Sequence, residues 1–185
     1  GNGSGQPKIT PNALNRLGDG KWYYFDAGGR KITKKGWRAL SSAKYIQIGA
    51  SGYVTAKMEK SGGTFKYHVY NYKAGRWEKQ RDTWNTVKEK QYYFNKNGNC
   101  TKIYNTKTRK CQRYKNGRMH TVKKDVSALH NGKLYYFDAR GVRDTKKGWK
   151  KASGIRYIQV GTSGCATAKI QKSGQIYRYY KYNAH

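Results

Sequence analysis

Aromatic residues recur along the chain in short clusters separated by polar stretches. Most clusters lie 21 or 22 residues apart, and their centres are Tyr23, Tyr45, Tyr67–Tyr72, Tyr92, Tyr114, Tyr135, Tyr157 and Tyr179–Tyr182. In a cluster such as residues 22–25, successive side chains of a β-strand would point to opposite faces. No stretch of useful length repeats with a helical period. The pattern predicts an all-β protein.

Turn residues follow the aromatic clusters and predict β-hairpins. Asp26–Gly29, Asn95–Gly98 and Asp138–Gly141 each come directly after an aromatic strand, and these residue types favour the positive φ of tight turns. A second short strand then runs toward a Gly-Trp pair, which is Gly36-Trp37 in the first case. Because a lone hairpin is only marginally stable, we expect the hairpins to stack. Trp37 should then reach a groove between units from the far strand of its hairpin.

A long internal duplication supports this repeat interpretation. Residues 18–71 align with residues 130–183 at a constant offset of 112, and 29 of the 54 positions are identical. Five hairpin steps make up the offset, which predicts about eight units of roughly 22 residues. We expect a flexible linker over residues 1–17 and a single continuous repeat domain over residues 18–185, with residues 72–129 as its divergent middle.

Composition and charge narrow the function classes. Hydrophobic residues make up 36% of the chain and include 18 Tyr, 5 Trp and 4 Phe. We therefore expect little aliphatic core, with burial supplied by tyrosine and tryptophan faces whose polar ends stay wet. Forty Lys and Arg face nine Asp and Glu, a net charge of +31. Because such an excess repels itself on folding, it predicts a polyanionic partner or environment.

The residues that catalysis and metal binding need are scarce. Asp26 and Asp138 hold turn positions that local hydrogen bonding explains. The histidines form no Cys/His or Ser/His/Asp arrangement; they are His68, His120, His130 and His185. Cys100, Cys111 and Cys165 fit no zinc spacing, and a disulfide between the first two stays open. We expect no enzyme activity, cofactor or metal. No apolar run has membrane-spanning length, so we expect no membrane insertion.

One motif resembles a known family. The stretch from Gly20 to Gly29, followed by Gly36-Trp37, resembles the cell-wall-binding repeat of choline-binding proteins, glucan-binding domains and clostridial toxins. The residues that match it are Trp22, Tyr23, Tyr24, Phe25, Trp37, Tyr135, Tyr136, Phe137 and Trp149, and more loosely Trp84, Tyr92, Tyr93 and Phe94. The resemblance implies a secreted or cell-wall-associated Gram-positive protein, folded as a solenoid of stacked β-hairpins. It also implies ligand sites between adjacent hairpins, with Trp37, Trp149, Tyr24, Tyr136, Tyr45, Tyr157, Trp84 and Tyr92 as the candidate ligand-binding residues.

Departures from the repeat favour an anionic ligand over choline. Lysine replaces the usual threonine before Gly-Trp, and Lys44 and Arg156 stand where a choline site would want tryptophan. Choline is held by cation–π attraction to aromatic rings, which a +31 environment opposes. We expect Lys34, Lys35, Lys146 and Lys147 to contact the polyanion. Because Trp22 becomes Leu134 in the second copy, Trp37 and Trp149 are the preferred repeated site.

These observations favour a noncatalytic module that binds a cell-wall or host-surface glycan, in particular an anionic or teichoic-acid-like polymer. One alternative is nonspecific nucleic-acid binding, because single-strand binders interleave aromatic and basic residues. Another is a structural, adhesive stalk. Oligomerisation through an exposed repeat edge near Tyr179–His185 also stays open.

Overall fold

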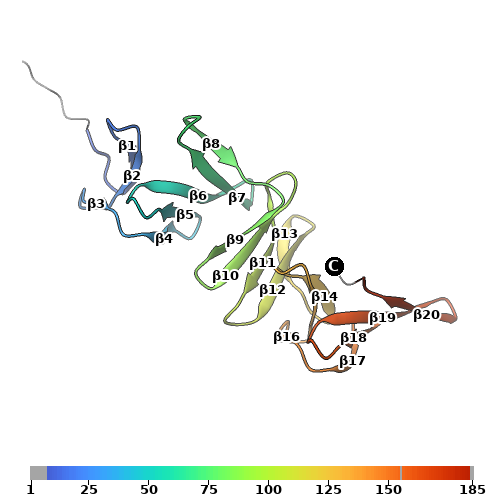
Figure 1. The fold of residues 1–185 in the computed structure, drawn as a ribbon. Helices are drawn as coiled ribbons and strands as arrows, with labels where there is room; N and C mark the ends of the chain where they lie inside the picture. The colour runs from blue at the N-terminus through green and yellow to red at the C-terminus, as the bar shows by residue number, and fades with distance from the viewer. Residues whose placement is uncertain (1–7, 155, 184–185) are drawn as a thin grey trace, which may run out of the picture. The chain divides into compact units, whose positions relative to one another are not determined.

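The computed structural model describes residues 8–154 and 156–183. Over these residues the regular structure is entirely β, with twenty strands in five antiparallel sheets and no helix (Figure 1). The predicted all-β hairpin fold is confirmed. The chain divides into two compact units: the first holds residues up to 82 together with 94–99, and the second holds 83–93 together with residues from 100 onward. A single continuous domain over residues 18–185 stays a prediction.

The first unit begins with a three-stranded sheet in the order β1-β2-β3. Its strands are β1 (Ala13–Arg16), β2 (Trp22–Phe25) and β3 (Lys31–Ile32). β1 pairs with β2 in the register Ala13↔Phe25, although it lies within the stretch 1–17 that was expected to be a linker. Residues 1–7 of that stretch lie outside the described residues.

The first unit also contains a five-stranded sheet in the order β4-β5-β6-β7-β8. Phe94 is counted with this unit, although it is the last residue of a strand whose other residues belong to the second unit. The strands of the sheet are β4 (Gly36–Ser41), β5 (Lys44–Ile48), β6 (Val54–Ser61), β7 (Thr64–Asn71) and β8 (Arg76–Lys79). Gly36-Trp37 opens β4, so its expected place on the far strand of the preceding hairpin was wrong. The reason is that β3 is only two residues long, and the chain has entered the next sheet before it reaches Trp37.

The second unit contains the other three sheets. The five-stranded sheet has the order β13-β12-β11-β10-β9, from β9 (Thr83–Val87), β10 (Lys90–Phe94), β11 (Cys100–Asn105), β12 (Lys110–Lys115) and β13 (Arg118–Thr121). The next has the order β14-β15-β16, from β14 (Asp125–Ala128), β15 (Leu134–Phe137) and β16 (Arg143–Asp144). The last has the order β17-β18-β19-β20, from β17 (Gly148–Lys151), β18 (Arg156–Val160), β19 (Ala166–Ser173) and β20 (Ile176–Lys181).

The predicted turns form through one recurring hydrogen-bond pattern. Oδ1 of Asp26 accepts from the backbone N–H groups of Gly28 and Arg30 at 3.0 and 2.9 Å. Asn95 and Asp138 do the same for the residues two and four positions later. Each side chain therefore replaces backbone partners that a tight turn cannot supply. This local role of the two aspartates was predicted, and it is confirmed.

The core differs from the expected one. The most deeply buried side chains are mainly aliphatic or phenylalanine: Phe94, Phe137, Ile46, Ile48, Met58, Ile158, Val54, Val160 and Cys111. All five tryptophans keep part of their surface in solvent. The expectation of little aliphatic core was wrong, whereas the expected burial of tyrosine faces is confirmed at Tyr24, Tyr70, Tyr92, Tyr104, Tyr135 and Tyr136. Short β-branched side chains fit the inner faces of closely packed sheets, and Trp22 and Trp77 pack against the core around Ile46 and Ile48.

The duplicated segments fold alike. Trp37 pairs with Gln47 across β4 and β5, and Trp149 pairs with Gln159 across β17 and β18. A bulge follows at the same position of both copies, next to Gln47 and Gln159. A sheet and its register were thus copied together with the sequence.

The three cysteines are free thiols and buried. No disulfide joins Cys100 to Cys111, the pairing that the sequence left open. Burial raises the pKa of the Cys100 thiol to about 12 and also raises the pKa of Cys111. Because the thiolate is the reactive form, these two cysteines act as small apolar core residues.

Candidate functional site

Trp37 and Tyr45 lie on one face of the β4–β8 sheet. Ala39 is paired with Tyr45, and Trp37 is two residues from Ala39, so both rings project to the same side. The Trp37 ring lies 6.1 Å from that of Tyr67, and the Tyr45 ring lies 5.9 Å from that of Phe65. Both predicted residues are half-buried within the first unit. They take part in packing and keep an exposed edge.

Trp149 and Tyr157 occupy the matching positions of the second unit, where the face is open. Both are exposed, at 45% and 40%. Two tyrosines of β20 join them across the sheet, because Ile170 is paired with both Tyr157 and Tyr179 and Tyr177 shares the face with Tyr179. The exposures of Tyr177 and Tyr179 are 59% and 53%. We call these four rings the open aromatic face. Sequence reasoning identified Trp149 and Tyr157 but not the two β20 rings.

Three other predicted ligand residues are buried. The hydroxyl of Tyr24 donates to Asn12 Oδ1 at 2.9 Å, and that of Tyr136 donates to the backbone oxygen of Lys151 at 2.8 Å. Tyr92 is also in the core, with 3% of its surface exposed. These side chains hold the sheets together and present little surface to a ligand.

The four predicted polyanion contacts are all exposed: Lys34, Lys35, Lys146 and Lys147. They lie just before Gly36-Trp37 and Gly148-Trp149, in the connections that lead into β4 and β17. In the sequence, each lysine pair therefore directly precedes the Gly-Trp pair of its own copy.

A second aromatic group lies in the second unit, on three adjacent strands. Trp84 is on β9, Tyr93 on β10 and Lys102 on β11. The ring centroids of Trp84 and Tyr93 are 5.3 Å apart, and the His130 ring is 6.2 Å from Trp84. Together with Ala128, Leu129 and Gly132 they line a cavity of about 290 Å³. We call Trp84, Tyr93, Lys102 and His130 the aromatic–basic site.

The aromatic partner of Trp84 is Tyr93 and not the expected Tyr92. The tryptophan-to-tyrosine interval of eight residues occurs three times in the sequence, but the registers differ. In β4–β5 a bulge between Ala39 and Ser41 adds one residue to one strand. β9 and β10 are joined by only two residues, of which Lys88 has a positive φ of 54°.

Lys102 is held inside the aromatic–basic site. Its Nζ lies 5.8 Å from the ring centroid of Trp84 and 5.9 Å from that of Tyr93. It donates a hydrogen bond to the backbone oxygen of Ala128 at 2.9 Å. Burial lowers the pKa of Lys102 below its ordinary value. A half-buried ammonium beside a cavity is a donor that a ligand oxygen can reach without first ordering the side chain.

A neighbouring cavity repeats this combination of rings and a cation. It has a volume of about 260 Å³ and shares Leu129 and His130 with the aromatic–basic site. The Arg143 guanidinium lies 4.9 Å from the ring centroid of Tyr135 and 5.6 Å from that of Tyr104. Rings that could face a sugar and cations that could face an acidic group thus lie in adjacent cavities.

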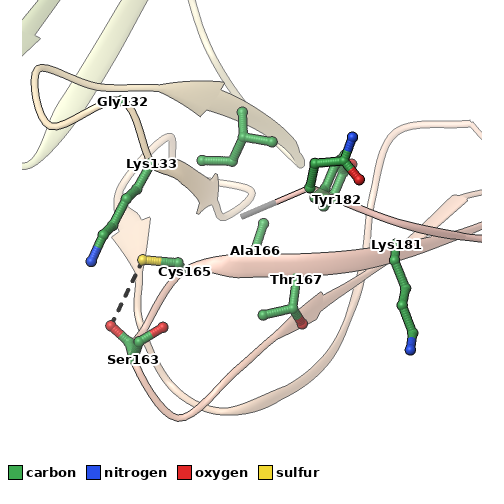
Figure 2. A pocket seen from close by; sticks show the side chains of 10 residues that line it. Gly132, Lys133, Ser163, Cys165, Ala166, Thr167, Lys181 and Tyr182 are labelled. Carbon is green, nitrogen blue, oxygen red and sulfur yellow. Dashed lines mark hydrogen bonds between the residues drawn. The ribbon is translucent and has the colours of Figure 1, made fainter. Parts of the chain in front are cut away.

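A larger cavity, of about 550 Å³, lies between β15 and β19 of the second unit, and Figure 2 shows its lining. Its residues include Leu134, Cys165 and Ala166, where the first copy has Trp22, Tyr53 and Val54. All three replacements are smaller and leave room in the second copy. Lys133 and Lys181 lie at opposite ends of the lining in the view of Figure 2. The Cys165 thiol donates to the backbone oxygen of Ser163.

Within the part of the chain that the structure describes, no group of three His, Cys, Asp or Glu side chains could hold a metal ion. No helical segment of residues 8–154 and 156–183 has the length and apolar character needed to cross a membrane.

The family comparison matches two segments of the chain. Residues 17–31 and 82–100 match the putative cell wall binding repeat. The first segment contains Trp22–Phe25 and the second contains Trp84 and Tyr93. The resemblance seen in the sequence is therefore confirmed for these segments, whereas residues 132–149 lie outside them. No curated protein matches the chain.

Solved structures with similar folds belong to longer chains. Alternansucrase in complex with isomaltononaose is 18% identical, with 86% of this chain and 15% of that chain covered and a TM-score of 0.29. Choline binding protein F from Streptococcus pneumoniae, with a peptidoglycan analogue, is 16% identical, with 85% and 59% covered and a TM-score of 0.24. The modular autolysin LytC from the same organism is 12% identical, with 94% and 44% covered and a TM-score of 0.21. The chain spans less than two thirds of each.

Proposed function

We propose that this chain is a noncatalytic module that attaches its protein to an anionic glycan of a Gram-positive cell wall or cell surface. The observation that carries the proposal is the placement of the fixed cation Lys102 against the half-buried rings of Trp84 and Tyr93, inside a chain that matches a cell wall binding repeat. Aromatic rings offer apolar faces with low conformational entropy, and Lys and Arg supply donors for carboxylate or phosphate groups.

Two surfaces of the second unit would share the binding. The open aromatic face presents Trp149 with three tyrosines, and the aromatic–basic site presents Trp84 beside Lys102. Weak sites on one chain add avidity when a polymer can reach several of them. The predicted contacts at Lys34, Lys35, Lys146 and Lys147, the extracellular location, and one continuous repeat domain over residues 18–185 belong to the same proposal.

Retention on purified cell walls tests the proposal. We expect Trp149→Ala and Trp84→Ala each to weaken binding several-fold, and the double variant to weaken it more than either. Ile176→Ala is the matched control, because Ile176 is equally exposed on β20 and projects to the opposite side from Tyr177 and Tyr179. Undiminished retention of the double variant would exclude the aromatic sites. Equal binding of nucleic acid and of every polyanion would instead indicate charge alone.

A further inference from the structure

Cations placed against two neighbouring aromatic rings recur in both units. The three groups are Lys21 with Tyr53 and Tyr72, Lys102 with Trp84 and Tyr93, and Arg143 with Tyr104 and Tyr135. In each case a cation of the chain itself lies 4.5–5.9 Å from the centroids of both rings, within the range of cation–π attraction, which extends to about 6 Å. Only the Lys102 group combines a tryptophan, a hydrogen-bonded ammonium and an adjoining cavity.

The position of Lys102 is fixed from two directions. The two ring faces attract its ammonium, and the Ala128 carbonyl accepts one of its three protons at 2.9 Å. β11 supplies the lysine and β14, a strand of a different sheet of the second unit, supplies the carbonyl, so the packing of the two sheets determines the distance between them. A ligand cation entering the same place would meet this ammonium at short range with little solvent between, where like-charge repulsion is strong.

The adjoining cavity faces the opposite kind of ligand group. Its volume of about 290 Å³ is near the lower end of small-molecule pockets, about 300–1,000 Å³. It contains no carboxylate: its lining is Trp84, Tyr93, Lys102, Ala128, Leu129, His130 and Gly132. An acidic sugar could place its ring on the indole and its negative group beside Lys102 Nζ.

We propose that Lys102 is the residue that determines the charge specificity of the aromatic–basic site. By holding its positive charge beside both Trp84 and Tyr93, it excludes quaternary ammonium groups and selects acidic sugar units. The selection of acidic sugars rests on the proposed function. The exclusion of cations does not, so the two can fail separately.

Titrations of four proteins with choline and with polygalacturonate test this inference. They are the unaltered chain, Lys102→Ala, Lys102→Arg and the control Lys107→Ala, which removes an exposed lysine of the same unit. The indole N–H resonance of Trp84 reports on the site, and Trp84→Phe assigns it. We expect Lys102→Ala to bind choline at least about tenfold more tightly than the unaltered chain and to bind polygalacturonate several-fold more weakly. Lys102→Arg and Lys107→Ala should keep the original preference.

Each outcome has a defined meaning. Choline binding at Trp84 of the unaltered chain as tight as that of Lys102→Ala would overturn the proposal, as would a folded Lys102→Ala protein that gains no choline binding. A choline gain without polygalacturonate binding by any variant would support the exclusion of cations and overturn the selection of acidic sugars at this site. If Lys102→Ala does not fold, the chemical shifts of the Lys102 side-chain methylene protons in the unaltered chain are followed as choline is added. Ring-current shifts that choline leaves unchanged would support the proposal. Loss of these shifts on addition of choline would overturn it.

Discussion

His68 is a single residue that makes the stability of this basic chain depend on pH. It lies half-buried on β7, and its Nδ1 has no hydrogen-bond partner within the described part of the chain. Burial lowers the pKa of His68 below 6.5, and the charges of Lys57, Lys79 and Lys66 lower it further while Glu59 opposes them. The imidazole is therefore neutral in the folded protein under conditions in which an unfolded chain would begin to protonate it.

This pKa shift predicts a loss of stability in mild acid. As the pH falls below 6.5, the unfolded chain takes up the proton first, so the free energy of unfolding decreases until the folded-state pKa is passed. His68→Tyr, which installs the residue found at the matched position 180, should remove this part of the acid sensitivity. The melting temperature between about pH 7.5 and pH 5 measures it. His120→Tyr, at an exposed histidine, is the control; an unchanged acid response in His68→Tyr would contradict the assignment.

At the scale of single elements, the two copies of one turn offer a matched comparison. Gly29 and Gly141 both close an aspartate turn with positive φ, at 74° and 77°. A Cβ at Gly29 would meet nothing within 4 Å. A Cβ at Gly141 would lie 2.5 Å from Thr121 Cγ2 and 3.2 Å from the backbone oxygen of Val122. The same turn is therefore open in one copy and covered by a neighbouring strand end in the other.

Alanine substitutions should separate backbone strain from steric overlap. Gly29→Ala should cost about 1 kcal/mol of unfolding free energy through the left-handed backbone alone. Gly141→Ala should cost more, about 2–4 kcal/mol, because Thr121 and the backbone at Val122 must also move. Urea unfolding of both variants measures the difference. Equal losses of unfolding free energy in the two variants would mean that residues 121–122 move aside without an energetic cost, and would contradict this prediction.

Local chemistry made the elements predictable, but not their registers. Asp26, Asn95 and Asp138 identified their turns because the side chain that accepts the hydrogen bonds belongs to the turn itself. The contact of Trp84 with Tyr93 depended on a two-residue connection, whereas the same sequence interval in β4–β5 contains a bulge. A shift of one residue reverses the face of every side chain. The family resemblance led to Trp84, and only the structure showed Lys102 beside it.

At the scale of the whole molecule, excess positive charge opposes folding and favours binding to polyanions. Forty basic residues and nine acidic ones leave most cations without a carboxylate of the chain to pair with. Ion pairs such as Lys150–Asp144 and Arg156–Asp125, at 2.9 and 3.2 Å, engage only a few of them. The sequence made this conflict visible from composition alone. Composition does not show which of these cations contact aromatic rings, because those contacts depend on the order of the strands.

Salt should therefore change stability and binding in opposite directions. Raising NaCl from about 0.05 to 0.5 M shortens the screening length well below about 10 Å, so repulsion weakens and the melting temperature should rise by several degrees. Over the same range, retention on an anionic glycan polymer should fall at least about tenfold, because released counterions no longer favour the complex. Binding to a neutral glycan through aromatic faces should change little and serves as the control. A melting temperature that falls as salt rises would show that ion pairs contribute more to stability than charge repulsion removes. Retention on the anionic polymer that does not depend on salt would show that the aromatic rings, and not the charges, supply the binding free energy.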